Sequence, residues 1–120
     1  MSPRSLLAAC LLSSMVAGVT ASQSCETIEA AAIKSAARIP GHASGHTVIG
    51  QGRLQFFSAP CVGCKLQGVF IRPGERVNAY LASSGYVLVM YLDTKTGSEA
   101  NGWVQQNRLK ANDYGIAPKQ

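Results

Sequence analysis

The chain has 120 residues, of which 47% are hydrophobic and 14% are charged, and its formal net charge is +5. This length excludes a second domain and leaves one domain with a real but modest hydrophobic core. The mild basic bias could favour an anionic partner, such as an acidic protein face, a cell-wall polymer or nucleic acid, but by itself it mostly reports solubility and steering. Nucleic acid is not expected, because the chain has no run of Lys and Arg and no motif that interleaves basic and aromatic residues.

Residues 1–21 have the pattern of a secretory signal peptide: a basic start at Arg4, an apolar run to Val19 and small residues before cleavage after Ala21. A membrane anchor is disfavoured, since polar residues and Gly interrupt the run and it is shorter than the ~20 residues of a span. Lipidation of Cys10 is disfavoured too, because the apolar segment before it is too short. We expect a periplasmic or secreted protein with no membrane span after cleavage.

The segment 22–41 is expected to hold one amphipathic helix, from Ser24 to Ile39, that ends before Pro40-Gly41. Ser24 is placed to cap the first turn, and acidic residues near the start with basic residues near the end suit the helix dipole. The apolar positions recur at intervals of three and four and are mostly small, so this side can lie close against a sheet. We therefore expect the helix to cover a face or an end of a barrel.

A glycine-rich linker and a first strand are predicted at 42–52, a barrel at 53–110 and a flexible tail at 111–120. The expected strands are 47–49, 54–58, 77–81, 86–92 and 102–105, and a helical turn is expected at 106–109. Phe56 and Phe57 should point to opposite faces, and one of them could be partly exposed. The stretch 86–92 is apolar on both faces, which predicts a central strand covered on its second side by the helix.

Cys61 and Cys64 are compatible with a redox motif, a zinc site or a structural disulfide. A thioredoxin-type motif needs a helix beginning at the first cysteine, whereas the residues after Cys64 are β-prone. A zinc site with His42 and His46 would place both histidines in a glycine-rich loop that does not align them. We therefore expect no metal or cofactor.

Signal cleavage leaves Cys25, Cys61 and Cys64, which allow three single pairings. We prefer Cys25 with Cys64, because this bond would staple the helix to the barrel. It would close a loop of about 40 residues, worth about 4 kcal/mol in the chain-entropy model. Cys61 would then be a free thiol or a second, exchange-competent partner.

Several short motifs follow one another between Leu54 and Leu109: Phe-Phe-Ser-Ala-Pro at 56–60, Phe-Ile-x-Pro-Gly at 70–74, Val-Met-Tyr at 89–91, and Gly-Trp-Val at 102–104 before Arg108. Together they resemble small periplasmic bacterial Src-homology-3-like (SH3-like, SH3b-type) domain proteins. The resemblance implies a mainly β fold, a small SH3-like barrel of about five strands preceded by one N-terminal α-helix. In similar sequences one cysteine falls where Cys64 stands and another near the start of the preceding helix, which supports the staple; Cys61 departs from this pattern.

The resemblance implies recognition rather than catalysis, because bacterial domains of this class bind cell-wall peptides or act on protein partners as inhibitors or immunity proteins. We expect no enzyme activity and no catalytic residue. In a cysteine-type wall peptidase the nucleophile is followed by histidines, whereas His42 and His46 precede the cysteine pair. Neither histidine has a serine motif beside it.

The candidate ligand site is a groove between barrel loops, lined by aromatic side chains that offer flat contact area. The expected ligand-binding residues are Phe57, Tyr80, Tyr86, Trp103, Arg72 and Arg76. Arg53 and Arg108 could add charge complementarity. The alternative is that two or more of the aromatic residues, Trp103 above all, belong to the core.

The first functional hypothesis is an exported, non-catalytic module that recognises a protein partner in the periplasm, for instance as inhibitor or immunity protein of a cell-wall-acting enzyme or toxin. The alternative is a module that binds peptidoglycan peptides and so targets the cell wall. The third hypothesis is a redox or zinc protein built on the two neighbouring cysteines.

Overall fold

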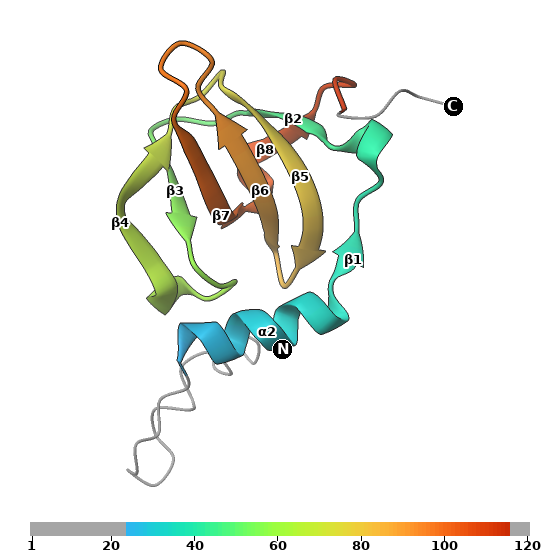
Figure 1. Cartoon of the computed structure of the whole chain (residues 1–120), viewed down its shortest axis with the longest axis vertical. Coiled ribbons are helices and arrows are strands. Elements are labelled where there is room, and N and C mark those ends of the chain that lie inside the picture. Colours follow the sequence, from blue (N-terminus) through green and yellow to red (C-terminus); the bar gives the residue numbers. More distant parts are fainter. Residues whose placement is uncertain (1–23, 116–120) are drawn as a thin grey trace, which may run out of the picture.

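The computed structural model describes residues 24–115, which form a curled antiparallel sheet with a helix across one end (Figure 1). The predicted signal peptide, its cleavage site and Cys10 lie outside the described residues, as does the end of the predicted tail, 116–120. Among the described residues, no helix is long and apolar enough to cross a membrane.

The described chain begins with one α-helix, α2 (Cys25–Ser35). The strands are β1 (Ala37–Arg38), β2 (Gly45–Val48), β3 (Leu54–Phe57), β4 (Lys65–Ile71), β5 (Arg76–Ser83), β6 (Tyr86–Leu92), β7 (Glu99–Gln105) and β8 (Leu109–Ala111). Three short 3-10 turns connect them, η2 (Gly41–Ala43), η3 (Val62–Cys64) and η4 (Gln106–Arg108).

The sheet has the strand order β4-β3-β7-β6-β5-β2-β8, and β1 pairs with β5 outside this path. The predicted fold class, a small mainly β barrel preceded by one helix, is confirmed. The sheet has eight strands where about five were expected. The additional strands β1, β4 and β8 are short, or bent by a register shift, so their sequences carry little regular alternation.

The concave side of the sheet encloses the main core, to which six of the strands contribute apolar side chains. Its buried members are Val48, Leu54, Phe56, Ile71, Val77, Ala79, Val87, Val89 and Val104. Leu109, just after η4, packs against this cluster, as expected for a residue that closes one end of the barrel.

Part of the second face of the sheet is buried as well, because α2 covers it. Phe56 belongs to the main core and Phe57 to a separate cluster with Ala32 of α2 and Trp103 of β7. The expectation that one of the two phenylalanines would be partly exposed is wrong: Phe56 is 0% and Phe57 5% exposed. The small side chain of Ala32 lets the helix approach this face closely.

The central strand β6 confirms the prediction made from its two apolar faces. Val87 and Val89 point into the main core, whereas Tyr86 and Leu88 pack against the cluster beneath the helix. β6 lies between β5 and β7, so both of its edges are hydrogen-bonded. An apolar run in the interior of the sheet is therefore covered from both sides.

Helix α2 begins as predicted, with the Ser24 hydroxyl accepting a hydrogen bond from the Thr27 N–H over 3.1 Å. It ends at Ser35 rather than Ile39, because Ala36 is already extended (φ −70°, ψ 154°). The chain then continues as β1, and the Ile39 N–H donates to the Tyr80 carbonyl oxygen at 2.9 Å. Pairing with β5 thus replaces the last predicted turn of helix.

A hydrogen bond links the helix to the centre of the sheet: the Trp103 Nε1–H donates to Glu29 Oε2 over 3.0 Å. The indole is completely buried. A buried N–H needs an acceptor, and here the acceptor comes from the helix that covers it. The bond therefore fixes which helix face meets the sheet.

We predict that Glu29→Ala will lower the free energy of unfolding by about 1–3 kcal/mol, because it leaves the buried indole N–H without an acceptor. Glu29→Gln should lose less, since its side-chain carbonyl can still accept the bond. Urea unfolding monitored by Trp fluorescence measures both. Glu26→Ala, on the exposed side of the same helix, is the control, and an equal loss in that variant would contradict the assigned role of Glu29.

Candidate binding site

The four aromatic residues predicted to line a groove do not share one accessible surface. Trp103 and Phe57 are buried beneath α2, so the alternative that placed them in the core is the one the structure shows. The prediction that these two side chains are exposed is wrong, because α2 packs on this face of the sheet and buries them. Tyr80 and Tyr86 are half-buried, and the Tyr86 ring meets the Phe57 ring edge-on with centroids 5.3 Å apart.

Tyr86 lines an open pocket at the end of the barrel near η4. The pocket has a volume of about 380 Å³, and its lining consists of Gly85, Tyr86, Gln105, Gln106 and Asn107. A hydrogen bond of 2.9 Å from the Gln106 N–H to the Gly85 carbonyl oxygen joins the two turns that form it. Burial raises the pKa of the Tyr86 phenol above its ordinary value of 10.0.

The pocket combines one aromatic ring with three carboxamides and carries no charged side chain among its lining residues. Carboxamides both donate and accept hydrogen bonds, as peptide groups do. The arrangement can therefore recognise a neutral, amide-rich ligand by paired hydrogen bonds and ring contact.

The predicted arginine Arg72 lies elsewhere, on the outside of the β3–β4 hairpin. Its guanidinium is 5.8 Å from the centroid of the Phe70 ring, and the Arg53 guanidinium is 4.2 Å from the same centroid. Both arginines are exposed. One ring thus positions two cations.

A single glutamine side chain holds the bend of this hairpin. The Gln55 amide donates to the carbonyl oxygens of Phe56 at 2.8 Å, Leu66 at 2.6 Å and Val69 at 3.1 Å. The pairing of β3 with β4 shifts register at this place, and Gly68 has φ +77°, a conformation that suits glycine. The anchored bend leaves Phe70 directly opposite Gln55.

The other predicted arginine, Arg76, is exposed at the start of β5 and lies 4.7 Å from the centroid of the Tyr114 ring. The Tyr114 segment follows β8 and lies against β2, where the Asn112 side chain donates to Thr47 Oγ1 over 2.9 Å. A Cβ at Gly45 would collide with the Tyr114 carbonyl, so glycine is required there. The ordered chain therefore extends beyond the predicted barrel end at 110.

Arg108 connects η4 to the loop between β2 and β3. Its guanidinium donates to three backbone carbonyl oxygens, those of Ile49 (2.6 Å), Gly52 (2.6 Å) and Arg53 (3.4 Å). This side chain therefore holds the loop that carries Arg53. Backbone carbonyls do not neutralise the guanidinium, so the positive charge of Arg108 adds to the electrostatic potential at this end of the barrel.

Glu75 lies between the two predicted arginines in sequence and is engaged by a tyrosine. The Tyr91 hydroxyl donates to Glu75 Oε1 over 2.7 Å. This hydrogen bond is the main reason why the pKa of Tyr91 is raised to about 12. The nearby Arg72 acts in the opposite direction and lowers it slightly.

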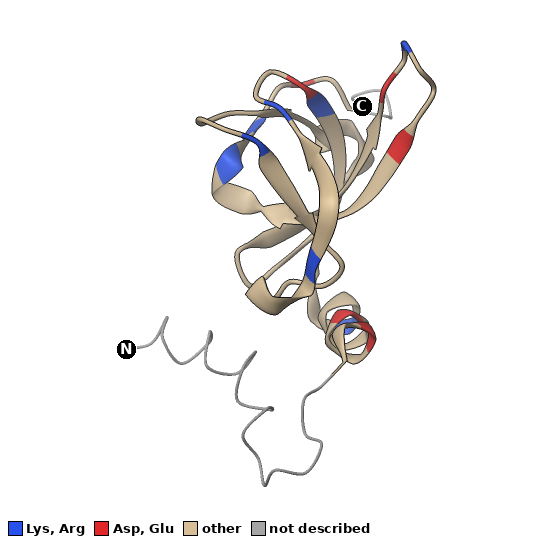
Figure 2. Cartoon of the chain, turned by 90° about the vertical axis from the view of Figure 1, so that its left-hand side faces the viewer, with Lys and Arg blue, Asp and Glu red and all other residues tan. Residues whose placement is uncertain are grey.

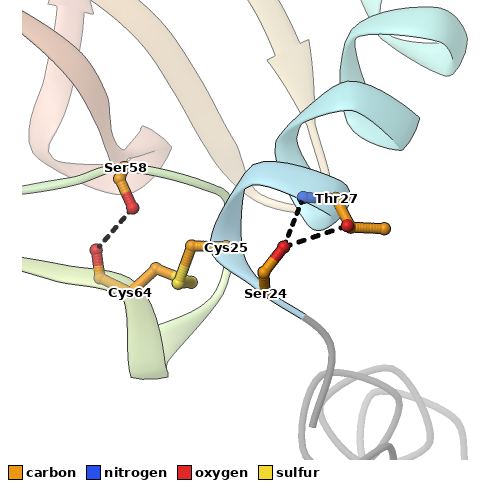
Figure 3. The surroundings of a disulfide bond; sticks show 5 residues. All are labelled: Ser24, Cys25, Thr27, Ser58 and Cys64. Carbon is orange, nitrogen blue, oxygen red and sulfur yellow. Dashed lines mark hydrogen bonds between the residues drawn. A yellow bond between two sulfur atoms is a disulfide. The ribbon is translucent and has the colours of Figure 1, made fainter.

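The predicted disulfide between Cys25 and Cys64 is confirmed (Figure 3). Its Cα atoms are 5.8 Å apart, and it joins the first turn of α2 to the end of η3. The Ser58 N–H donates to the Cys64 carbonyl oxygen at 2.8 Å and fixes the loop around the bond. Cys61 is 4% exposed and is disulfide-bonded as well, so it is not a free thiol.

The two histidines do not approach the cysteines as a metal site. His42 is exposed in η2, and His46 Nδ1 lies 2.9 Å from the Ser44 carbonyl oxygen. Within residues 24–115, no group of three or more His, Cys, Asp or Glu side chains is arranged to hold a metal ion.

The carboxamide residues that line the pocket beside Tyr86 and the aromatic partners of the arginines were not predicted from the sequence. Gln105, Gln106 and Asn107 were assigned only to a strand end and a helical turn, and Phe70 only to a motif. The consecutive carboxamides before Arg108 are a visible signal. The convergence of Arg53 and Arg72 on Phe70 depends on the pairing register, which no local pattern specifies.

Searches of protein-family models, curated proteins and solved structures found no match to this chain.

We predict that Tyr91→Phe will change the pH dependence of stability at high pH. The folded-state pKa of about 12 lies above the ordinary value of 10.0, so the Tyr91–Glu75 pair stabilises the protein fully below pH 10.0 and less as the pH rises towards 12. The difference in unfolding free energy between wild type and variant should shrink over this range. Absorbance titration at 295 nm should also lose its last phenol ionisation in Tyr91→Phe.

As a control, Glu75→Gln should move that ionisation down towards 10.0, because the carboxylate is the main cause of the shift. An unchanged titration in Glu75→Gln would contradict the assignment.

We predict that replacing both Cys25 and Cys64 by Ala will lower the free energy of unfolding by about 4 kcal/mol in the chain-entropy model, since the bond closes a sequence separation of 39 residues. Urea unfolding of the two non-reduced proteins tests this. Equal midpoints would show that the bond does not restrain the unfolded chain.

Proposed function

We propose that this protein is an exported, non-catalytic binding module of the SH3-like type that recognises a protein partner in the periplasm, for instance as inhibitor or immunity protein of a cell-wall-acting enzyme or toxin. The Cys25–Cys64 disulfide supports an exported protein, because such bonds persist in oxidising compartments. The signal-peptide pattern of residues 1–21 supports the same location.

The observation that carries the proposal is the pocket formed by Tyr86 and the carboxamides of Gln105, Gln106 and Asn107. Its volume of about 380 Å³ lies at the lower end of ligand pockets and suits a short segment of a larger partner better than a whole cofactor. An extended peptide segment presents alternating N–H and C=O groups, which carboxamides can match. The partner would therefore place one loop or chain end in this pocket.

A peptidoglycan peptide is the second candidate ligand, since it too is a short peptide. Wall peptides carry free carboxylates, whereas none of the five lining residues is cationic. The uncharged lining therefore favours the protein partner. The redox and zinc hypotheses rank below both, because Cys64 is bonded to Cys25 of the helix rather than to Cys61.

We predict that Asn107→Ala, alone and with Gln105→Ala, will reduce capture of the partner from periplasmic extract at least tenfold, because it removes exposed hydrogen-bonding groups of the pocket. Both side chains are exposed, so the thermal midpoint should stay within a few degrees. Tagged exported protein is used as bait, and bound proteins are identified by mass spectrometry.

Asn101→Ala is the matched control, because Asn101 is an exposed asparagine of β7 outside the pocket. Parallel binding to purified peptidoglycan sacculi separates the two candidates. Retention on sacculi that is lost in Asn107→Ala, with no protein captured, would replace the protein partner by the wall peptide.

A further inference from the structure

We propose that Arg53 and Arg72, together with the Phe70 ring between them, form a carboxylate-binding site, and that its ligand is a carboxylate-rich segment of a protein partner. The inference rests on the proposed function in that the partner is a protein. It concerns a different surface from the pocket at Tyr86. Figure 2 shows Lys and Arg on several strands and loops of the barrel, and Asp and Glu both on α2 and on the barrel.

The register of the hairpin brings the two arginines together. Leu54 pairs with Ile71, and both are buried; Gln55 pairs with Phe70 on the outer face. If this pairing register is extended by one residue, Arg53 lies opposite Arg72. Side chains alternate between the two faces of a strand, so both arginines lie on the same face of the sheet as Phe70. Residues directly opposite in an antiparallel pair have Cα atoms about 4.5–5.5 Å apart. Two guanidiniums are therefore held at one place on the surface.

Like charges placed directly opposite one another destabilise a pair of strands. Among the described residues, the contacts of the Arg53 and Arg72 side chains are with the Phe70 ring and not with a carboxylate. Both side chains are exposed, so their guanidinium groups are accessible from solvent. A bound carboxylate would accept hydrogen bonds from these groups and offset the repulsion.

The nearest carboxylate along the chain does not fill this role. Glu75 Oε1 accepts a hydrogen bond of 2.7 Å from the Tyr91 hydroxyl. The pKa of Tyr91 is about 12, so the hydroxyl keeps its proton and remains a donor at neutral pH. Arg108 adds a fixed positive charge beside Arg53, since its own donors are taken by backbone carbonyls. The site therefore keeps an excess of positive charge.

A second group of cations lies on β5 and β8, on either side of β2. Thr47 of β2 pairs with Arg76 of β5 on one side and with Lys110 of β8 on the other, so the three side chains form an outward row. Arg76 and Lys110 are two strand spacings apart, which is about 10 Å. Arg76 is held over the Tyr114 ring at 4.7 Å.

Acidic residues interrupt this surface, which favours a protein over a uniform polyanion. Glu75 lies between Arg72 and Arg76 in the chain, and Asp113 is exposed next to Tyr114. A phosphate polymer with evenly spaced charges would meet both carboxylates, whereas a folded partner can match an uneven pattern of charges. The carboxylates of such a partner also suit the fork of an arginine.

The test uses poly-L-glutamate as the carboxylate probe, with polyphosphate and single-stranded DNA at matched charge for comparison. Binding to the exported protein is measured by fluorescence anisotropy of labelled probes at low and at physiological salt. We expect poly-L-glutamate to bind, and R53Q/R72Q to weaken this binding at least tenfold. R53K/R72K should bind at an intermediate level, because lysine keeps the charge but lacks the planar fork.

Lys34→Gln on α2 is the matched control and should change binding less than twofold. The thermal midpoint of R53Q/R72Q should be unchanged or raised, since the substitutions remove a repulsion. Unchanged poly-L-glutamate binding in R53Q/R72Q, or tighter binding of polyphosphate or DNA than of poly-L-glutamate, would overturn the proposal. Asn107→Ala should bind the probe like wild type, so a failure of the pocket hypothesis is recognised separately.

Discussion

The structure depends on the covering of a sheet that is apolar on its interior face and on part of its outer face. The interior face closes on itself, but the face that carries Phe57 and Trp103 needs a second layer, and α2 is the layer available among the described residues. An eleven-residue helix is marginal by itself in water. The Cys25–Cys64 bond and the Trp103–Glu29 hydrogen bond therefore hold in place an element that the core requires.

This covering determines which aromatic side chains are accessible from solvent. In a barrel without the helix, Phe57 and Trp103 would form an exposed aromatic face and an obvious place for a ligand. With Ala32 packed against them, the two proposed binding surfaces lie at the margin of the covered face, where Tyr86 meets the η4 turn, and on the outside of the hairpin. The two surfaces differ in chemistry, since one is neutral and rich in amides and the other is cationic.

Local sequence patterns were sufficient to predict much of the fold. The two-sided apolar run of β6 predicted both a central strand and its cover, and the Ser24 cap set the start of α2. The end of α2 could not be predicted, because pairing of β1 with β5 competes with the last helical turn and depends on tertiary contacts. For the same reason an aromatic residue such as Trp103 could not be assigned to core or surface until the helix position was known.

The arrangement of charges illustrates what a sequence leaves open in a small β protein. Arg53 and Arg72 are 19 positions apart and separated by a bent hairpin, so only the register fixed by Leu54–Ile71 pairing and by the Gln55 amide brings them together. In the proposed role of this pair, a bound carboxylate offsets the repulsion between the two cations. A surface of this kind accelerates encounter with an acidic partner, whereas short-range hydrogen bonds at a neutral pocket select among partners that arrive.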